Sequence, residues 1–130
     1  MNKLLLAVSL SIGMILSSYA ADNNFTDPAK PIVVSKQHPI FTIKLPSNRT
    51  TGFMWVLVHY NDHLIEPLSA AYRAPDSKLI GAPGYEIWKF KVKTIGCVVP
   101  QVTNLKLSYA RSWNLEQSRV LNFKVVCAGK

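Results

Sequence analysis

Two cysteines, Cys97 and Cys127, are the most reactive side chains of this sequence. A catalytic cysteine would need a free thiolate beside a histidine. Cys127 instead ends an alternating apolar run near the C-terminus, and Cys97 is the other cysteine with which it can pair. We therefore expect one disulfide bridge between them and no cysteine catalysis.

The histidines give little basis for a metal site. His59 and His63 are four residues apart, but this spacing does not bring two imidazoles together on a strand and its following turn as it would on a helix. A third ligand is missing, and no Ser, Cys or carboxylate pair has a recognisable catalytic setting. We expect no metal, no cofactor and no enzyme activity.

Three polar segments contain residue types that are common in binding surfaces. The first reads Pro-Ser-Asn-Arg-Thr-Thr-Gly-Phe over residues 46–53, the second Gly-Ala-Pro-Gly over 81–84, and the third Ala-Arg-Ser-Trp over 110–113. Threonine hydroxyls both donate and accept hydrogen bonds, glycine permits positive φ, and Arg and Trp are frequent interface anchors. Each segment alone is typical of an ordinary turn. Their meaning therefore depends on whether the fold brings them together.

Seven runs of alternating apolar and polar residues surround these segments. A period of two places apolar side chains on one face, which indicates β-strands. The runs cover residues 32–36, 40–45, 53–60, 64–72, 85–93, 105–109 and 121–127. They predict an all-β fold, an antiparallel β-sandwich. In such a sandwich the connections after the second, fourth and sixth strands lie at one end, and here these are residues 46–52, 73–84 and 110–118.

The three tryptophans differ in their expected environment. Trp55 and Trp88 fall in the core-facing phase of their runs, whereas Trp113 follows an arginine in a turn-like segment. We expect the first two to pack in the core and Trp113 to be exposed.

The first 20 residues differ from the rest of the chain. Lys3 precedes an apolar run over residues 4–16, and Ser-Tyr-Ala follows at 18–20, a pattern typical of a secretory signal peptide. We expect a signal peptide over 1–20, a flexible lead over 21–30 and a folded domain over 31–130, with no membrane span in the mature chain. Export to the periplasm or the cell exterior would place the cysteines where disulfides persist.

The chain is basic, with 15 Lys and Arg against 7 Asp and Glu and a net charge of +8. Removing residues 1–20 removes Lys3 alone among the charged side chains, which leaves +7. Lys89, Lys91 and Lys93 alternate along one predicted strand. They fit a solvated sheet face that prevents aggregation or a contact with anionic lipid or nucleic acid. The solvated face is the favoured interpretation, and we expect no nucleic-acid partner.

Together, the three polar segments resemble the binding loops of the chagasin family of cysteine-peptidase inhibitors. That family has an Asn-Pro-Thr-Thr-Gly-aromatic motif, a Gly-x-Gly-Gly motif before an aromatic strand, and an Arg-Pro-Trp motif after a strand that ends in Tyr. The order, spacing and flanking apolar residues agree over residues 31–126. This chain departs from the motifs at Arg49, Pro83 and Ser112, where the family has Pro, Gly and Pro.

The resemblance implies an immunoglobulin-like sandwich of about seven strands that inhibits papain-like cysteine peptidases reversibly and without a covalent bond. It implies that the Thr50-Thr51-Gly52 loop enters the catalytic cleft while the other two loops grip its rims. We expect a monomer whose peptidase-binding residues are Asn48, Thr50, Thr51, Gly52, Phe53, Gly81, Gly84, Arg111 and Trp113. The alternative is an exported β-sandwich that binds an anionic surface or glycan and has no peptidase target.

Overall fold

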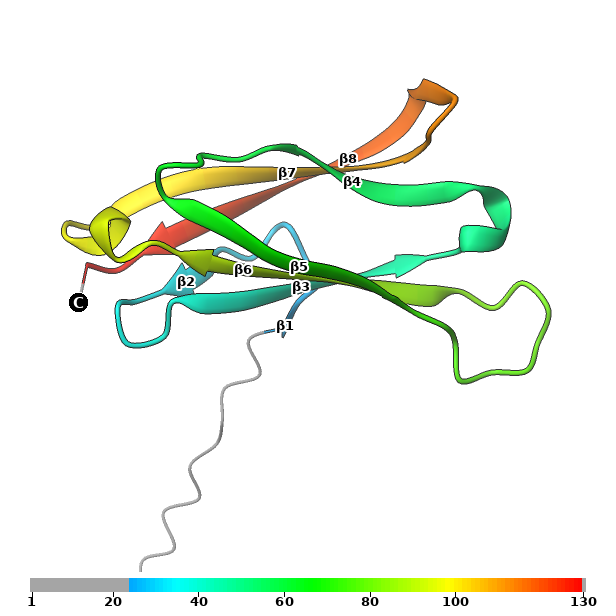
Figure 1. The fold of residues 1–130 in the computed structure, drawn as a ribbon, viewed down its shortest axis with the longest axis horizontal. Coiled ribbons are helices and arrows are strands. Elements are labelled where there is room, and N and C mark those ends of the chain that lie inside the picture. The colour runs from blue at the N-terminus through cyan, green and yellow to red at the C-terminus, as the bar shows by residue number, and fades with distance from the viewer. Residues whose placement is uncertain (1–23, 130) are drawn as a thin grey trace, which may run out of the picture.

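The strands form two four-stranded sheets that pack face to face, as the computed structural model of residues 24–129 shows (Figure 1). Sheet A has the order β1-β3-β6-β5, with bounds Asn24–Phe25, Ile40–Ser47, Gly84–Val92 and Ile65–Arg73. Sheet B has the order β2-β8-β7-β4, with bounds Ile32–Val34, Asn114–Cys127, Gln101–Arg111 and Phe53–His59. Two short 3₁₀ helices, η1 (Arg49–Thr51) and η2 (Thr94–Cys97), lie in the connections. The predicted all-β sandwich is confirmed, and the predicted signal peptide lies outside the described residues.

The core lies between the sheets, where the apolar phase of each strand points inward. Phe41 of β3 and Phe90 of β6 are cross-strand neighbours whose rings stack with centroids 5.4 Å apart. Leu105, Leu107 and Phe123 close the core from sheet B, and all five side chains are fully buried. Trp55 is buried and Trp88 packs against the same core, as their phase predicts.

Two short strands add parallel pairs at the sheet edges, so the sandwich is not antiparallel throughout. Strand β1 pairs in parallel with β3, and β2 pairs in parallel with β8. Strand β1 falls within residues 21–30, where the sequence predicts a flexible lead. Strands of two or three residues are held mainly by backbone hydrogen bonds to a longer neighbour and need no alternating pattern. Asn24–Phe25, inside the predicted lead, thus pair with sheet A.

The hairpin between β7 and β8 is longer, and its turn tighter, than the sequence predicts. Arg111 pairs with Asn114, which leaves only residues 112 and 113 in the turn instead of the predicted connection 110–118. The start of β8 is largely exposed, so its residues do not alternate in polarity as the core-facing strands do. Backbone pairing with β7 extends this strand beyond the part that the apolar pattern marks.

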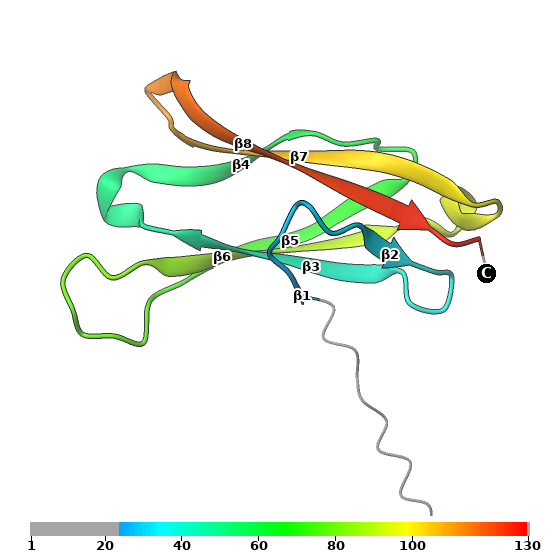
Figure 2. The ribbon, with the colours of Figure 1, turned by 180° about the vertical axis from the view of Figure 1, so that it is seen from behind.

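Three connections meet at one end of the sandwich, as predicted. Figure 1 shows the β3–β4, β5–β6 and β7–β8 connections at the same end, opposite η2 and the end of β8, and Figure 2 shows the same arrangement from behind. Because consecutive long strands reverse direction, segments that are about 30 residues apart in the sequence become neighbours in space.

Cys97 of η2 and Cys127 of β8 form the predicted disulfide at the opposite end. Their Cα atoms are 5.5 Å apart and both residues are buried. The bridge ties the connection between β6 and β7 to the last strand.

Among the described residues, no helix has the length and apolar character to cross a membrane.

We expect removal of the disulfide to destabilise the domain strongly. The cysteines are 30 residues apart in the sequence, and the chain-entropy model assigns such a loop about 3 to 4 kcal/mol. The Cys97→Ser/Cys127→Ser variant should therefore melt more than about 10 °C below the native protein. Calorimetry measures this shift, with mass spectrometry before and after reduction as the control. Two freely alkylated thiols in the native protein would contradict the bridge.

Candidate functional site

The turn between β3 and β4, residues 48–52, is called here the wedge loop. Asn48 begins it with an extended backbone, φ −112° and ψ 94°, and residues 49–51 form η1. The Oδ1 atom of Asn48 accepts hydrogen bonds from the backbone N–H of Thr50 at 3.2 Å and from its hydroxyl at 2.6 Å. This is the capping arrangement that asparagine favours at the start of a helical turn.

The backbone carbonyl and N–H of Asn48 also form hydrogen bonds that hold the wedge loop. Its carbonyl oxygen accepts hydrogen bonds from the backbone N–H of Thr51 at 3.3 Å and from the Thr51 hydroxyl at 2.7 Å. Its N–H donates to the Tyr109 hydroxyl oxygen at 2.9 Å, which ties the loop to β7. Both threonine hydroxyls therefore donate within the loop, while their side chains remain exposed.

Gly52 ends the turn with φ +80°, in the left-handed region that favours glycine. Its N–H donates to the Arg49 carbonyl oxygen at 3.1 Å. A Cβ atom at Gly52 would lie 2.5 Å from the Trp113 ring. Gly52 therefore adopts the positive φ that its residue type permits, and the close approach of Trp113 is a second reason for glycine at this position.

The wedge loop contacts both neighbouring loops. The Asn48 side-chain amide donates to the Gly81 carbonyl oxygen at 3.2 Å, which connects the wedge loop to the β5–β6 loop. On the other side, Nε of Arg111 donates to the Thr51 carbonyl oxygen at 3.0 Å. The three segments that the sequence singles out thus form one connected surface.

Aromatic contacts support the side of this surface that faces β7. The Phe53 ring stacks on Tyr109 with centroids 5.1 Å apart, and the Arg111 guanidinium lies 4.5 Å from the centre of the Phe53 ring. The same guanidinium is 6.0 Å from the Trp113 ring. Arg111 and Phe53 are half-buried, whereas Trp113 is 72% exposed, which confirms its predicted exposure.

The two glycines of the β5–β6 loop occupy different environments. Gly81 has φ +81° and an open surrounding, as a loop-shaping glycine should. Gly84 is instead buried at the start of β6, where a Cβ atom would lie 2.2 Å from the Arg73 carbonyl oxygen. Its lack of a side chain lets β5 and β6 approach closely. Gly84 thus lies where it can shape the base of the loop through close strand packing, whereas a direct contact between Gly84 and a peptidase stays a prediction of the family resemblance.

Leu79 and Ile80 are exposed apolar residues in this loop that the sequence reasoning missed. Leu79 is 77% exposed and Ile80 is fully exposed. The turn is fixed by a bond from the Ala82 N–H to the Leu79 carbonyl oxygen at 3.2 Å, and Gly81, next in the chain, is bonded to Asn48. The sequence signal for an exposed apolar contact was the pair of adjacent branched apolar residues between a lysine and a glycine.

A buried carboxylate, also missed, supports the wedge loop from sheet A. Glu86 of β6 is 4% exposed, and its Oε2 accepts a hydrogen bond from the backbone N–H of Trp55 at 3.0 Å. Its Oε1 is 3.7 Å from Nη2 of Arg49, and the Arg49 guanidinium lies 4.7 Å from the centre of the Tyr72 ring. The position of Glu86 in the same phase as Trp88 and Phe90 was the available sequence signal.

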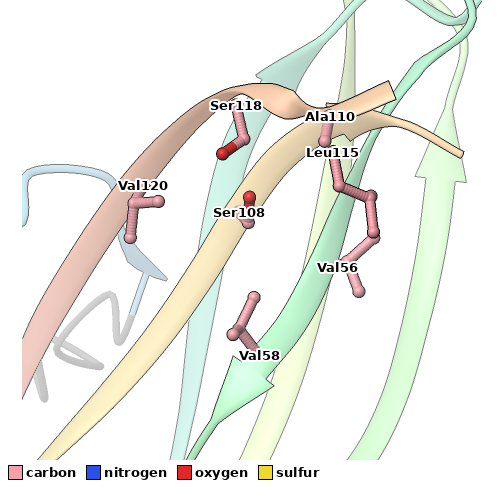
Figure 3. Close-up of a pocket in the computed structure, with 7 residues that line it drawn as sticks. All are labelled: Val56, Val58, Ser108, Ala110, Leu115, Ser118 and Val120. Carbon is pink, nitrogen blue, oxygen red and sulfur yellow. The ribbon is translucent and has the colours of Figure 1, made fainter. Parts of the chain in front are cut away.

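An apolar hollow of about 410 Å³ lies on the outer face of sheet B (Figure 3). Small residues of β7 form its floor, and branched side chains of β4 and β8 form its walls. It is lined by Val56, Val58, Ser108, Ala110, Leu115, Ser118 and Val120. None of these side chains titrates near neutral pH, so the hollow offers no acid, base or metal ligand for catalysis.

Comparison with known sequences finds a family model and a relative that match this chain. Residues 35–126 match the family model described as chagasin family peptidase inhibitor. The chain is also 36% identical over 75 residues to chagasin of Trypanosoma cruzi. That alignment covers 55% of this chain and 64% of chagasin, so it spans less than two thirds of the relative.

Two solved structures have a similar fold at low sequence identity. The cysteine protease inhibitor EhICP2 from Entamoeba histolytica is 19% identical with a TM-score of 0.55, and the match covers 73% of this chain and 93% of that one. Amebosin is 21% identical with a TM-score of 0.60, and the match covers 80% of this chain and 95% of that one. At these identities the two structures support the fold alone. The family assignment rests on the family model, which matches residues 35–126. With its three loops in the order of the family's motifs, the chain belongs to the chagasin family, whose members are peptidase inhibitors and not enzymes.

Proposed function

We propose that this protein is a reversible, non-covalent inhibitor of papain-like cysteine peptidases that inserts the wedge loop into the catalytic cleft. The observation that carries the proposal is the connection of the three loops through Asn48 and Arg111. A surface that is ordered before binding loses less conformational entropy when it docks. Exposed Thr50, Thr51 and Trp113 would be presented by this ordered surface.

The shape of the wedge loop also explains how it would resist cleavage. A peptidase needs an extended segment whose scissile carbonyl is aligned with the nucleophile. The wedge loop is a 3₁₀ turn, and the Thr51 carbonyl already accepts a bond from Arg111. Attack would require the turn to open and this bond to break. The loop would therefore fill the cleft with its backbone out of line for hydrolysis.

The flanking loops would supply apolar contacts on both rims of the cleft. Trp113 is exposed on the β7–β8 side, and Leu79 and Ile80 are exposed on the β5–β6 side. Large apolar side chains gain free energy when a partner removes them from water. Gly81 would shape one flank, and Arg111 would position the wedge loop through its bond to Thr51.

We further propose that the protein acts as an exported monomer. The signal-like sequence of residues 1–20 is the basis for export to the periplasm or the cell exterior. The disulfide is compatible with an oxidising compartment. The alternative function, anionic-surface binding without a peptidase target, does not account for the connected loops.

Titration of papain with the purified protein tests the proposed activity. We expect stoichiometric or tight reversible inhibition, with the inhibitor intact by mass spectrometry after prolonged incubation. Asn48→Ala removes the side-chain bonds to Thr50 and Gly81 and should weaken inhibition at least about tenfold. Asn122→Ala is the matched control, because Asn122 is an exposed asparagine of β8. Rapid cleavage between residues 48 and 53 with recovery of papain activity would make this chain a substrate.

Trp113→Ala tests the anchor on the β7–β8 side. Because the side chain is 72% exposed, its loss should change the melting temperature by no more than a few degrees. Inhibition should weaken by about 2 kcal/mol or more, as for a typical aromatic anchor. The melting temperature and the inhibition constant are measured on the same preparation. A large melting loss with unchanged inhibition would reject the anchor role.

A pair of double variants tests the β5–β6 flank. Leu79→Ser/Ile80→Ser should weaken inhibition about tenfold or more without lowering the melting temperature, because both side chains are exposed. Ile95→Ser/Val98→Ser is the matched control, since these residues are 76% and 61% exposed near η2, at the opposite end of the sandwich. Equal effects of both double variants on the inhibition constant would contradict a specific contact.

A further inference from the structure

The outer face of sheet A has four cationic side chains on three adjacent strands. In β3, Phe41, Ile43 and Leu45 point into the core, so Lys44 points outward. In β6, Phe90 and Val92 are buried, so Lys89 and Lys91 point outward. Arg73 of β5 is aligned with Tyr85 of β6 on the same outer face. Lys44, Arg73, Lys89 and Lys91 are called here the basic face.

The basic face differs from the lysine stripe that the sequence predicts. Lys93 lies beyond β6, at the start of η2, and its Nζ donates to the Asp62 carbonyl oxygen at 2.7 Å. It is therefore not part of the stripe. Strand pairing instead places Lys44 and Arg73 on the same face as the lysines of β6, which the alternation within one strand could not show.

The charge of this face is poorly neutralised. Within residues 24–129, the ion pairs below 4.0 Å are Arg49 with Glu86 and His63 with Asp62, and neither involves the basic face. Glu66 is aligned with Lys91 but forms no ion pair below this distance. Clustered cations without partner carboxylates repel one another, and an anionic surface would relieve that repulsion.

Exposed apolar and aromatic groups lie among these cations. Ile40 and Tyr85 are each 42% exposed, and Nζ of Lys44 lies 4.3 Å from the centre of the Tyr85 ring. Tyrosine is enriched at the boundary between lipid and water, where its ring meets apolar chains and its hydroxyl meets head groups. Lysine and arginine near an anionic leaflet are attracted to its negative potential. This mixture fits a phospholipid surface better than nucleic acid, for which a groove or stacking platform would be expected.

The three connected loops lie at one end of the sandwich and not on its broad face, so a contact made by the basic face would leave them free (Figure 1).

We propose that the basic face binds anionic phospholipid membranes and holds the protein on a lipid surface with its three loops free. This function is additional to peptidase inhibition and does not depend on it. Removing two cationic side chains from this face should reduce membrane affinity substantially. Each cation within a Debye length of an anionic surface contributes to the attraction.

Sedimentation with vesicles of phosphatidylglycerol and phosphatidylcholine, beside vesicles of phosphatidylcholine alone, tests the proposal. The mature protein should bind the anionic vesicles, and Lys89→Gln/Lys91→Gln should weaken this binding about tenfold or more. Lys106→Gln/Lys124→Gln is the control, because it removes the same charge from two neighbouring strands of sheet B, and each pair has one exposed and one half-buried lysine. We expect the control to change binding less than about twofold, and both variants to inhibit papain like the native protein.

Three results would overturn the proposal. The first is no binding of the native protein to anionic vesicles at low salt. The second is equal loss in both double variants, which would show that net charge and not the basic face governs binding. The third is tight binding to heparin or DNA with none to vesicles, which would assign the face to a different polyanion. Papain inhibition is measured separately, so failure of the inhibitor function would be recognised independently.

Discussion

The shape of the end of the sandwich where the three loops meet depends on the hydrogen bonds of one residue, Asn48. Its side chain caps η1 and reaches Gly81, while its backbone holds Thr51 and contacts Tyr109. Most of these bonds join groups within a five-residue turn, but two join it to strands or loops that are distant in the sequence. A surface turn of this length usually has several accessible conformations. Here the bonds of Asn48 select one, and Arg111 holds the far side of the same turn.

Glu86 extends this constraint into the interior. A carboxylate that is 4% exposed is costly unless it is paired and hydrogen-bonded. Glu86 receives a bond from the N–H of Trp55 on β4, the edge strand of sheet B, and Arg49 approaches it from the wedge loop. The Glu86 carboxylate therefore pairs with a backbone N–H of Trp55 that points away from β7. The same bond joins the two sheets next to the end where the three loops meet. This bond also leaves the edge of β4 less open to pairing with another chain.

The sequence was a good guide where a period of two marks a buried face, and a poor guide where backbone pairing or tertiary contact decides. It predicts the sandwich, the disulfide between Cys97 and Cys127, and the end at which the loops meet. It does not predict β1, because two residues contain no periodicity. It also does not show that Gly84 is buried, since a motif does not reveal that this glycine is needed for the close approach of Arg73. Leu79 and Ile80 were visible in the sequence, but their exposure depends on a turn that only the folded chain defines.

The side-chain contacts of Arg49 explain how this chain accommodates the loss of a family proline. Proline presets one backbone angle and so reduces the disorder of the free loop. Arg49 has no such restriction, but its guanidinium lies over the Tyr72 ring and near Glu86, on strands of sheet A. At the third loop, Ser112 also replaces a proline, and a two-residue turn closed by pairing of Arg111 with Asn114 restricts the chain instead. In both places local covalent rigidity has been replaced by contacts that exist only in the folded domain. The conformational order of the three loops is consequently coupled to the stability of the sandwich.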